Sequence, residues 1–111
     1  MEQTILSMIE RDIIKAQVIE ALETCFDPEI PVNIYELGLI YDVSVHETGG
    51  VEVKMTLTSP NCPAAQSLPP DVERKAASVR GVTSAKAIVV WEPTWTPAMM
   101  SDAAKLQLGM Q

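Results

Sequence analysis

The chain has 111 residues, of which 47% are hydrophobic and 5% aromatic, and it carries 15 acidic residues against 8 basic ones. This length predicts a single domain with a modest core packed mainly by aliphatic side chains. The formal net charge of −7 makes the surface repulsive to phosphate backbones, and no cluster of basic residues offsets it, so a nucleic-acid partner is not expected.

The cysteine content and the first residues indicate an intracellular protein. The chain holds two cysteines, Cys25 and Cys62, which are too few for the disulfide framework of a small secreted domain. Charged residues between Glu2 and Lys15 interrupt any signal-peptide core or membrane span. We therefore expect a cytoplasmic protein with no membrane partner.

The first part of the chain predicts one helix. Residues 1–11 are interpreted as an N-terminal lead-in, and residues 12–111 as the single domain. From Asp12, taken as the N-cap, apolar residues recur at helical spacing and predict a helix over residues 12–26. Pro28 ends this helix, because the residue before a proline disfavours the helical region.

A helical turn and a hairpin follow. Asn33 and Glu36 have capping-box spacing, and Gly38 fits the end of that turn. Residues 39–46 and 51–58 alternate apolar and polar side chains on either side of a glycine pair, which predicts two strands joined by a tight turn. Since only one face of each strand is apolar, helices should cover one side of the sheet.

The second half of the chain predicts a helix, a strand and a last helix. Consecutive prolines should divide the first of these helices into pieces over about residues 62–68 and 70–80. Residues 82–91 form the third strand, and Thr96 caps a helix over residues 97–108. The fold class is thus a two-layer α/β (α+β) domain with an α-β-β-α-β core, a three-stranded mixed sheet and a C-terminal helix.

Cys62 is the first candidate for chemistry. A threonine-rich strand enters a proline-bracketed turn, and Cys62 stands where the next helix should begin. The free N–H groups at a helix start can lower a thiol pKa and favour a reactive or metal-binding thiolate. The alternative is a small apolar residue packed under the turn. Cys25 falls on the apolar stripe of the first helix and is interpreted as a core residue.

Four polar residues could support Cys62. Asp27 and Glu29 place two carboxylates on a proline-stiffened loop, where they are either a solvated acidic turn or oxygen ligands for iron beside the thiol. Thr56 and Thr58 are expected on the open face of their strand, running toward Cys62, either as ordinary strand formers or as hydroxyls that hold the turn, a role that the short distance in sequence favours for Thr58. These residues complete the predicted site around Cys62.

The segment after the third strand alternates tryptophan and proline. Trp91, Trp95 and Met99 are interpreted either as residues that cover the core or as a rigid surface for contact with a partner. His46, the only histidine, is expected on the solvent-exposed side of a strand.

Four separated motifs resemble those of a known family. They are Asp27-Pro28-Glu29-Ile30-Pro31, the run from Asn33 to Tyr41, Met55-Thr56-Leu57-Thr58 with Cys62-Pro63, and Trp91-x-Pro93-x-Trp95-Thr96-Pro97-x-Met99-x-Ser101. Their order resembles the small iron–sulfur maturation proteins, which include SufT, PaaD and the eukaryotic cytosolic targeting subunit for iron–sulfur delivery. The resemblance covers residues 12–110.

The resemblance implies a fold akin to the C-terminal domain of the NifU scaffold and a role as an accessory factor, not an enzyme, in iron–sulfur cluster assembly or delivery. Cys62 matches the family's reactive cysteine and would hold iron or a transient cluster. Asp27, Glu29 and Thr58 match the supporting positions. The implied partners are the iron–sulfur assembly machinery and apo client proteins.

Departures from longer family members predict a short, single-domain member. Residues 1–11 contain neither the histidine nor the cysteine of the SufT amino-terminal motif, and no cysteine-rich extension follows at the carboxyl end. A site with one thiol makes a homodimer attractive, with two Cys62 side chains across a two-fold axis. The alternative function is a protein-interaction module for iron–sulfur clients, in which Cys62 is structural and no cluster is bound.

Overall fold

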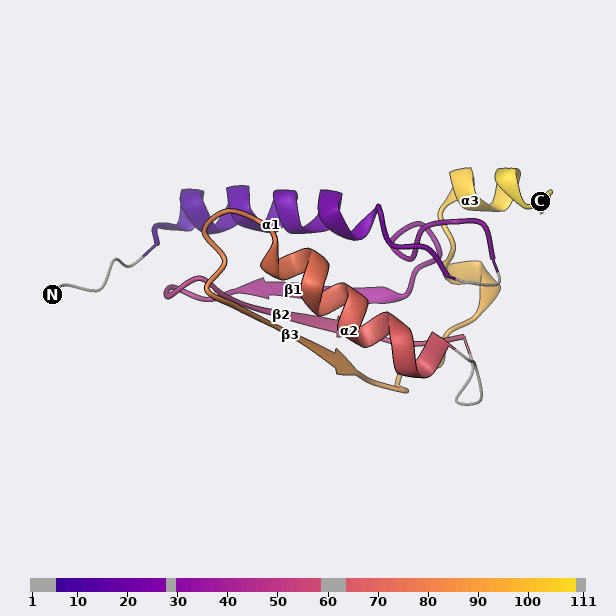
Figure 1. Cartoon of the computed structure of the whole chain (residues 1–111). Helices are drawn as coiled ribbons and strands as arrows, with labels where there is room; N and C mark the ends of the chain where they lie inside the picture. The colour runs from indigo at the N-terminus through magenta and orange to yellow at the C-terminus, as the bar shows by residue number, and fades with distance from the viewer. Residues whose placement is uncertain (1–5, 28–29, 59–63, 110–111) are drawn as a thin grey trace, which may run out of the picture.

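A computed structural model describes residues 6–27, 30–58 and 64–109, with residues 64–66 described by their backbone alone. The elements are α1 (Met8–Leu22), β1 (Ile40–Val45), β2 (Gly50–Met55), α2 (Ala64–Ala77), β3 (Ser84–Val89), the 3-10 helix η1 (Pro97–Met99) and α3 (Asp102–Gln107). The predicted α-β-β-α-β order with a C-terminal helix is confirmed (Figure 1). None of the described helices is long and apolar enough to cross a membrane.

The sheet is mixed, as predicted. Its strand order is β1-β2-β3, with β1 antiparallel to β2 and β3 parallel to β2. The hairpin closes where the N–H of His46 donates to the carbonyl of Gly50 at 2.8 Å. Gly49 has a φ of +90°, which fits a three-residue loop that ends in a bulge.

Helix α1 begins earlier than the sequence predicted. Ser7 accepts a hydrogen bond from the N–H of Glu10, and the Glu10 carboxylate accepts one from the N–H of Ser7, which forms a capping box. The prediction of Asp12 as the N-cap was therefore wrong, and so was the predicted end, because α1 stops at Leu22. The division of the chain into a lead-in and a domain stays a prediction.

Helix α2 runs without a break from Ala64 to Ala77 and contains both Pro69 and Pro70, so the predicted division into two pieces was wrong. Each proline lacks the N–H that would continue the helical hydrogen bonds. Leu68, Val72 and Ala76 lie on one face of α2 and are fully or almost fully buried. Burial of this face offsets the lost hydrogen bonds, because tertiary packing supplies most helical stability.

The last predicted helix is two short elements. Thr96 makes no side-chain cap bond, and Pro97 opens η1. Ser101 caps α3 separately, with its hydroxyl accepting from the N–H of Ala104 at 3.1 Å. The predicted single helix over residues 97–108 was wrong, because η1 ends at Met99 and Ser101 is the N-cap of a separate helix, α3.

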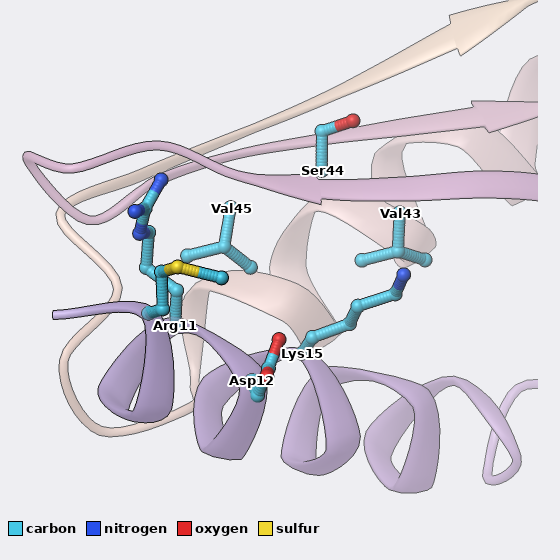
Figure 2. Close-up of a pocket in the computed structure, with 7 residues that line it drawn as sticks. Arg11, Asp12, Lys15, Val43, Ser44 and Val45 are labelled. Atoms are coloured by element: carbon cyan, nitrogen blue, oxygen red, sulfur yellow. The ribbon is translucent and has the colours of Figure 1, made fainter. Parts of the chain in front are cut away.

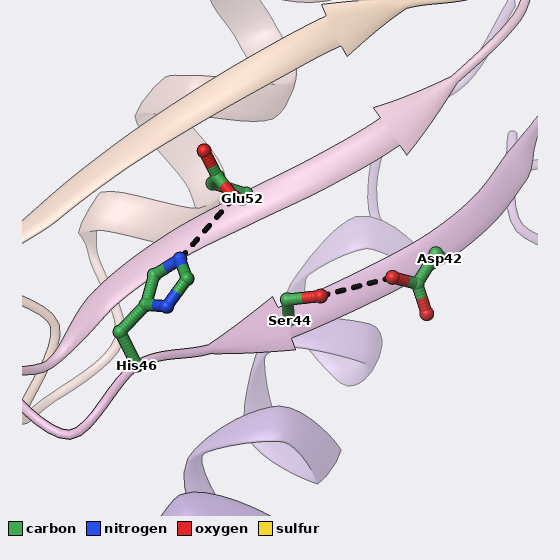
Figure 3. A network of polar contacts seen from close by, with 4 residues as sticks. All are labelled: Asp42, Ser44, His46 and Glu52. Atoms are coloured by element: carbon green, nitrogen blue, oxygen red, sulfur yellow. Dashed lines mark hydrogen bonds and ion pairs between the residues drawn. The ribbon is translucent and has the colours of Figure 1, made fainter.

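The core lies between the helices and one face of the sheet. Helix α1 packs over β1, whereas α2 packs over β3 and β2. The other face is polar, as predicted: Figure 3 shows Ser44 donating to Asp42 at 2.9 Å and His46 paired with Glu52 at 3.2 Å. Thr56 was expected on this open face, yet it is fully buried.

The outer edge of β3 is capped by a side chain. The Glu73 carboxylate on α2 accepts a hydrogen bond from the N–H of Ala87 at 2.9 Å. The register of β3 on β2 directs the N–H of Ala87 away from β2. Glu73 thus satisfies a donor on an edge that would otherwise be able to pair with another strand.

Replacing Glu73 with alanine should lower the free energy of unfolding by about 1 kcal/mol, because the Ala87 N–H loses its acceptor. Glu73→Gln keeps an acceptor oxygen and should retain most of the stability. Urea unfolding compares the two variants, and equal free energies of unfolding would contradict the capping role.

Candidate functional site

The loop after α1, which carries Asp27, and the chain after β2, which carries Thr58, lie at one end of the sheet, called here the site end, where β2 and β3 finish and β1 begins (Figure 1). Backbone hydrogen bonds join its segments. The N–H of Thr56 donates to the carbonyl of Leu39, and the N–H of Val90 donates to the carbonyl of Met55, both at 2.8 Å. Segments that are distant in the sequence are therefore held together at this end.

Asp27 is the described carboxylate of the predicted site. It is 5% exposed, and its Oδ1 accepts a hydrogen bond from the N–H of Ile30 at 3.2 Å. A bridge between Phe26 and Asn33 draws the two sides of this loop together. The interpretation of Asp27 as part of a solvated acidic turn is thus wrong, because its side chain is buried and anchors the loop.

Cys62 and Glu29 lie outside the described residues, so their predicted roles stay predictions. Thr58, the last described residue before Cys62, is half-buried. The first residue of α2 is Ala64, two positions after Cys62.

Thr56 was interpreted from the sequence as a strand former or, as an alternative, a hydroxyl that supports the turn before Cys62. It is fully buried, and its hydroxyl has no hydrogen-bond partner within the part of the chain that the structure describes. Such a group costs about 1–3 kcal/mol and calls for an explanation. The alternation of β2 would place Thr56 on the open face, so no sequence signal reveals this buried donor at the site end.

Cys25 is a core residue, as interpreted from the sequence, although it lies beyond the end of α1. It is 5% exposed, and its carbonyl accepts from the N–H of Ile34 at 2.8 Å. Burial raises the pKa of the Cys25 thiol, while Lys75 on α2 lowers it. Because burial is the larger effect, the thiol stays protonated at neutral pH and is a poor nucleophile and metal ligand.

The tryptophan segment divides into structural and exposed residues. Trp95 packs against the core, and its indole N–H donates to the carbonyl of Leu37 at 2.8 Å. Trp91 is 44% exposed. Met99 is half-buried, with its sulfur 3.6 Å from the hydroxyl of Tyr41. Of the three predicted contact residues, Trp91 is the one that the fold leaves largely open to solvent.

An open hollow of about 500 Å³ lies beside this segment and is lined by Gly38, Ile40, Tyr41, Pro93 and Met99. The Tyr41 hydroxyl donates to the carbonyl of Pro93 at 2.7 Å and fixes one wall. Gly38 has a φ of +82°, and a side chain there would clash with the Met99 backbone. Only glycine therefore permits this close approach at the site end.

The described residues alone do not complete a metal site. Across residues 6–27, 30–58 and 64–109, no group of three or more histidine, cysteine, aspartate or glutamate side chains is placed to hold a metal ion. His46 is exposed at the hairpin, at the opposite end of the sheet from the site end (Figure 1).

Comparison with known proteins identifies the relatives of this chain. Residues 15–87 match the family model described as "Iron-sulfur cluster assembly protein". A "Fe-S protein maturation auxiliary factor" from Porphyromonas gingivalis is 52% identical over 83% of this chain and 88% of its own length. The "Fe-S protein maturation auxiliary factor SufT" from Staphylococcus aureus is 39% identical over 76% of this chain and 96% of its own length.

A solved structure shares the fold. The crystal structure of a domain of unknown function from Bacillus anthracis superimposes with a TM-score of 0.86 at 36% identity, and the match covers 95% of this chain and all of that one. The two-layer fold and its single three-stranded mixed sheet are thus those of an experimentally determined relative.

The burial of Cys25 predicts slow thiol chemistry. In a Cys62→Ser variant, alkylation of Cys25 by iodoacetamide at pH 8 should be at least about tenfold slower in the folded than in the urea-unfolded protein. Equal rates in the two states would contradict its burial.

The same raised pKa predicts how stability depends on pH. The unfolded thiol ionises near its ordinary value of 9.0, whereas the folded thiol ionises at higher pH. The contribution of Cys25 to the free energy of unfolding is therefore constant below about pH 8 and falls as pH rises above 9. Urea unfolding of Cys62→Ser, with and without Cys25→Ala, isolates this contribution; a gain in stability at high pH would contradict it.

Proposed function

Since the chain belongs to the family of iron–sulfur cluster assembly proteins, we propose that it is an accessory factor that assembles or delivers iron–sulfur clusters to client proteins through Cys62. The observation that carries this proposal is the gathering of the Asp27 loop and the Thr56–Thr58 segment at one end of the sheet. Both segments precede Cys62 in the sequence, and the described parts of their family motifs lie together at the site end.

The start of α2 supports a reactive Cys62. Ala64 opens a helix of 14 residues, and Cys62 precedes it by two positions. The first N–H groups of a helix are free of internal partners and favour a negative charge nearby. A thiolate at Cys62 would gain from these donors, whereas Cys25 is held protonated by burial.

A single thiol suits transfer better than storage. Iron–sulfur clusters in proteins are commonly held by four cysteine thiolates, and Cys25 is buried in the core. Cys62 would therefore share iron or a cluster with donors from the assembly machinery, a client or a second copy of the chain. A cargo held by so few groups is released readily, which fits an accessory role without catalytic turnover.

The supporting residues have distinct proposed roles. Asp27 orders its loop through the Ile30 N–H, and its carboxylate together with Glu29 would tune or complete the iron site. Thr58 would hold the turn before Cys62. The hydroxyl of Thr56 is a buried donor that a rearrangement of this turn on loading would satisfy.

Anaerobic reconstitution with iron and sulfide tests the role of Cys62. The unmodified protein should gain visible absorption, Cys62→Ser should lose most of it, and Cys25→Ser, the matched control, should retain it. Client enzymes in cells should lose activity with Cys62→Ser alone. The proposal fails if Cys62→Ser neither alters the absorption nor lowers client activity.

A second function, recognition of apo clients without a bound cluster, is favoured by the exposure of Trp91, which comes two residues before Pro93 in the lining of the hollow with Tyr41 and Met99. Tryptophan is among the residue types that most often make the energetically dominant contacts of an interface. This surface would also serve the cluster-delivery function, since delivery requires contact with the client.

Trp91→Ala should weaken capture of an apo client by about tenfold or more while cluster content is unchanged. Trp95→Ala is the contrasting variant: it should lower the free energy of unfolding, because its indole is packed and bonded to Leu37. Loss of cluster content in Trp91→Ala, with client capture intact, would contradict the assignment of this surface.

A further inference from the structure

Helices α1 and α3 differ in what they pack against. Helix α1 lies on the sheet, and Figure 2 shows the side chains of Val43 and Val45 on β1 pointing toward it. Among the described residues, the Cα atoms of α3 come within 8 Å of no residue of α1, α2 or the three strands. Figure 1 shows α3 beside the loop that follows α1. The neighbours of α3 are therefore the loops of the site end.

A turn over residues 33–38 fixes where α3 begins. The indole N–H of Trp95 donates to the carbonyl of Leu37 at 2.8 Å. The N–H of Ser101, which is the N-cap of α3, donates to the carbonyl of Glu36 at 2.9 Å. The tryptophan segment thus follows this turn and brings α3 to the loop that carries Asp27.

The last residue of α3 bonds to that loop. The side-chain Nε2 of Gln107 donates to the carbonyl of Pro31 at 3.0 Å, although the two residues are 76 positions apart in the sequence. Pro31 lies within a tight turn, in which the N–H of Val32 donates to the carbonyl of Ile30 at 2.7 Å. Gln107 thus holds the middle of residues 30–32, called here the loop tip.

The loop tip also supplies the hydrogen bond to Asp27. The N–H of Ile30 donates to Oδ1 of the buried Asp27 carboxylate at 3.2 Å, and Pro31 follows Ile30 directly. Movement of the Pro31 carbonyl would move this donor, because the peptide bond before Pro31 is planar and the φ of proline is fixed. One tight turn therefore connects the Gln107 amide with the donor that orients Asp27.

The base of the loop is fixed independently of α3. The N–H of Ile34 donates to the carbonyl of Cys25 at 2.8 Å, and Phe26 forms a bridge with Asn33. These backbone contacts join the two ends of the loop and do not extend to its tip. Of the described residues outside the loop, Gln107 is the one that forms a hydrogen bond with the loop tip.

We propose that Gln107 is a positioning residue for Asp27 and that α3 serves to hold it against the loop tip. The inference rests on the proposed function, because it takes Asp27 to help hold iron or a cluster. Hydrogen bonds to a ligating carboxylate fix its orientation, and their loss lowers metal affinity. Gln107 acts through the loop tip, since it keeps the Ile30 N–H within reach of Asp27.

The exchange rate of the Ile30 amide, followed by ¹⁵N NMR, tests this role directly. Gln107→Met keeps the length and helix propensity of the side chain but removes the donor, so the Ile30 amide should exchange at least about threefold faster. Leu106→Met, at the neighbouring exposed position, is the matched control and should leave the rate unchanged. Gln107→Lys restores a donor and should restore slow exchange. Equal rates in the unmodified protein and in Gln107→Met would overturn the proposal.

The amide of Ala87 in β3 separates an effect on the loop from an effect on the whole fold. Its exchange rate should be the same in the unmodified protein and in Gln107→Met, because Gln107 is exposed and bonds to the loop. If the Ile30 and Ala87 amides were accelerated equally, Gln107 would stabilise the whole domain and the proposed positioning role would be wrong.

Anaerobic reconstitution with iron and sulfide relates the loop to its cargo. At limiting iron, Gln107→Met should take up at least about threefold less cluster than the unmodified protein, and Gln107→Lys should recover the uptake. Faster Ile30 exchange with unchanged uptake would mean that the position of Asp27 does not affect the site, and the proposal would be wrong. If the unmodified protein takes up no cluster, the proposed function fails, and the Ile30 rate still decides whether Gln107 positions Asp27.

Discussion

The parallel pairing of β3 with β2 is the constraint on which the rest of the structure depends. It runs in register from Gly50 beside Ser84 to Met55 beside Val89. Two consecutive parallel strands need a crossover, and α2 supplies it across the apolar face. As a result β2 and β3 end where β1 begins, so the loop after α1, the chain that leaves β2 and the tryptophan segment share one end of the sheet.

The sheet could be predicted because alternation of apolar and polar residues is a strong local signal. The incorrect predictions concern positions at which individual contacts determine the structure. The capping box between Ser7 and Glu10 moved the start of α1, and it was readable from spacing alone. The continuity of α2 through its prolines was not readable, because it depends on burial of Leu68 and Val72 against other elements. The burial of Thr56 was likewise not readable from the alternation of β2.

The candidate site can be compared with its prediction at the described residues only. The motifs grouped Asp27 with the chain that leads to Cys62, and the structure brings Asp27 and the end of β2 to the same end of the sheet. They did not distinguish Trp95, which is bonded to Leu37, from Trp91, which is exposed. Side-chain exposure depends on tertiary packing, which sequence spacing does not encode.

The central claim is that Cys62 acts as a thiolate, and the most direct test is the pKa of its thiol. In a Cys25→Ala variant, the rate of alkylation by iodoacetamide measured against pH reports Cys62 alone. An unperturbed cysteine thiol has a pKa of about 8.5 to 9, and the helix start predicts a midpoint below about 7.5. A midpoint at or above 8.5 would contradict the claim and would leave Cys62 as a packing residue.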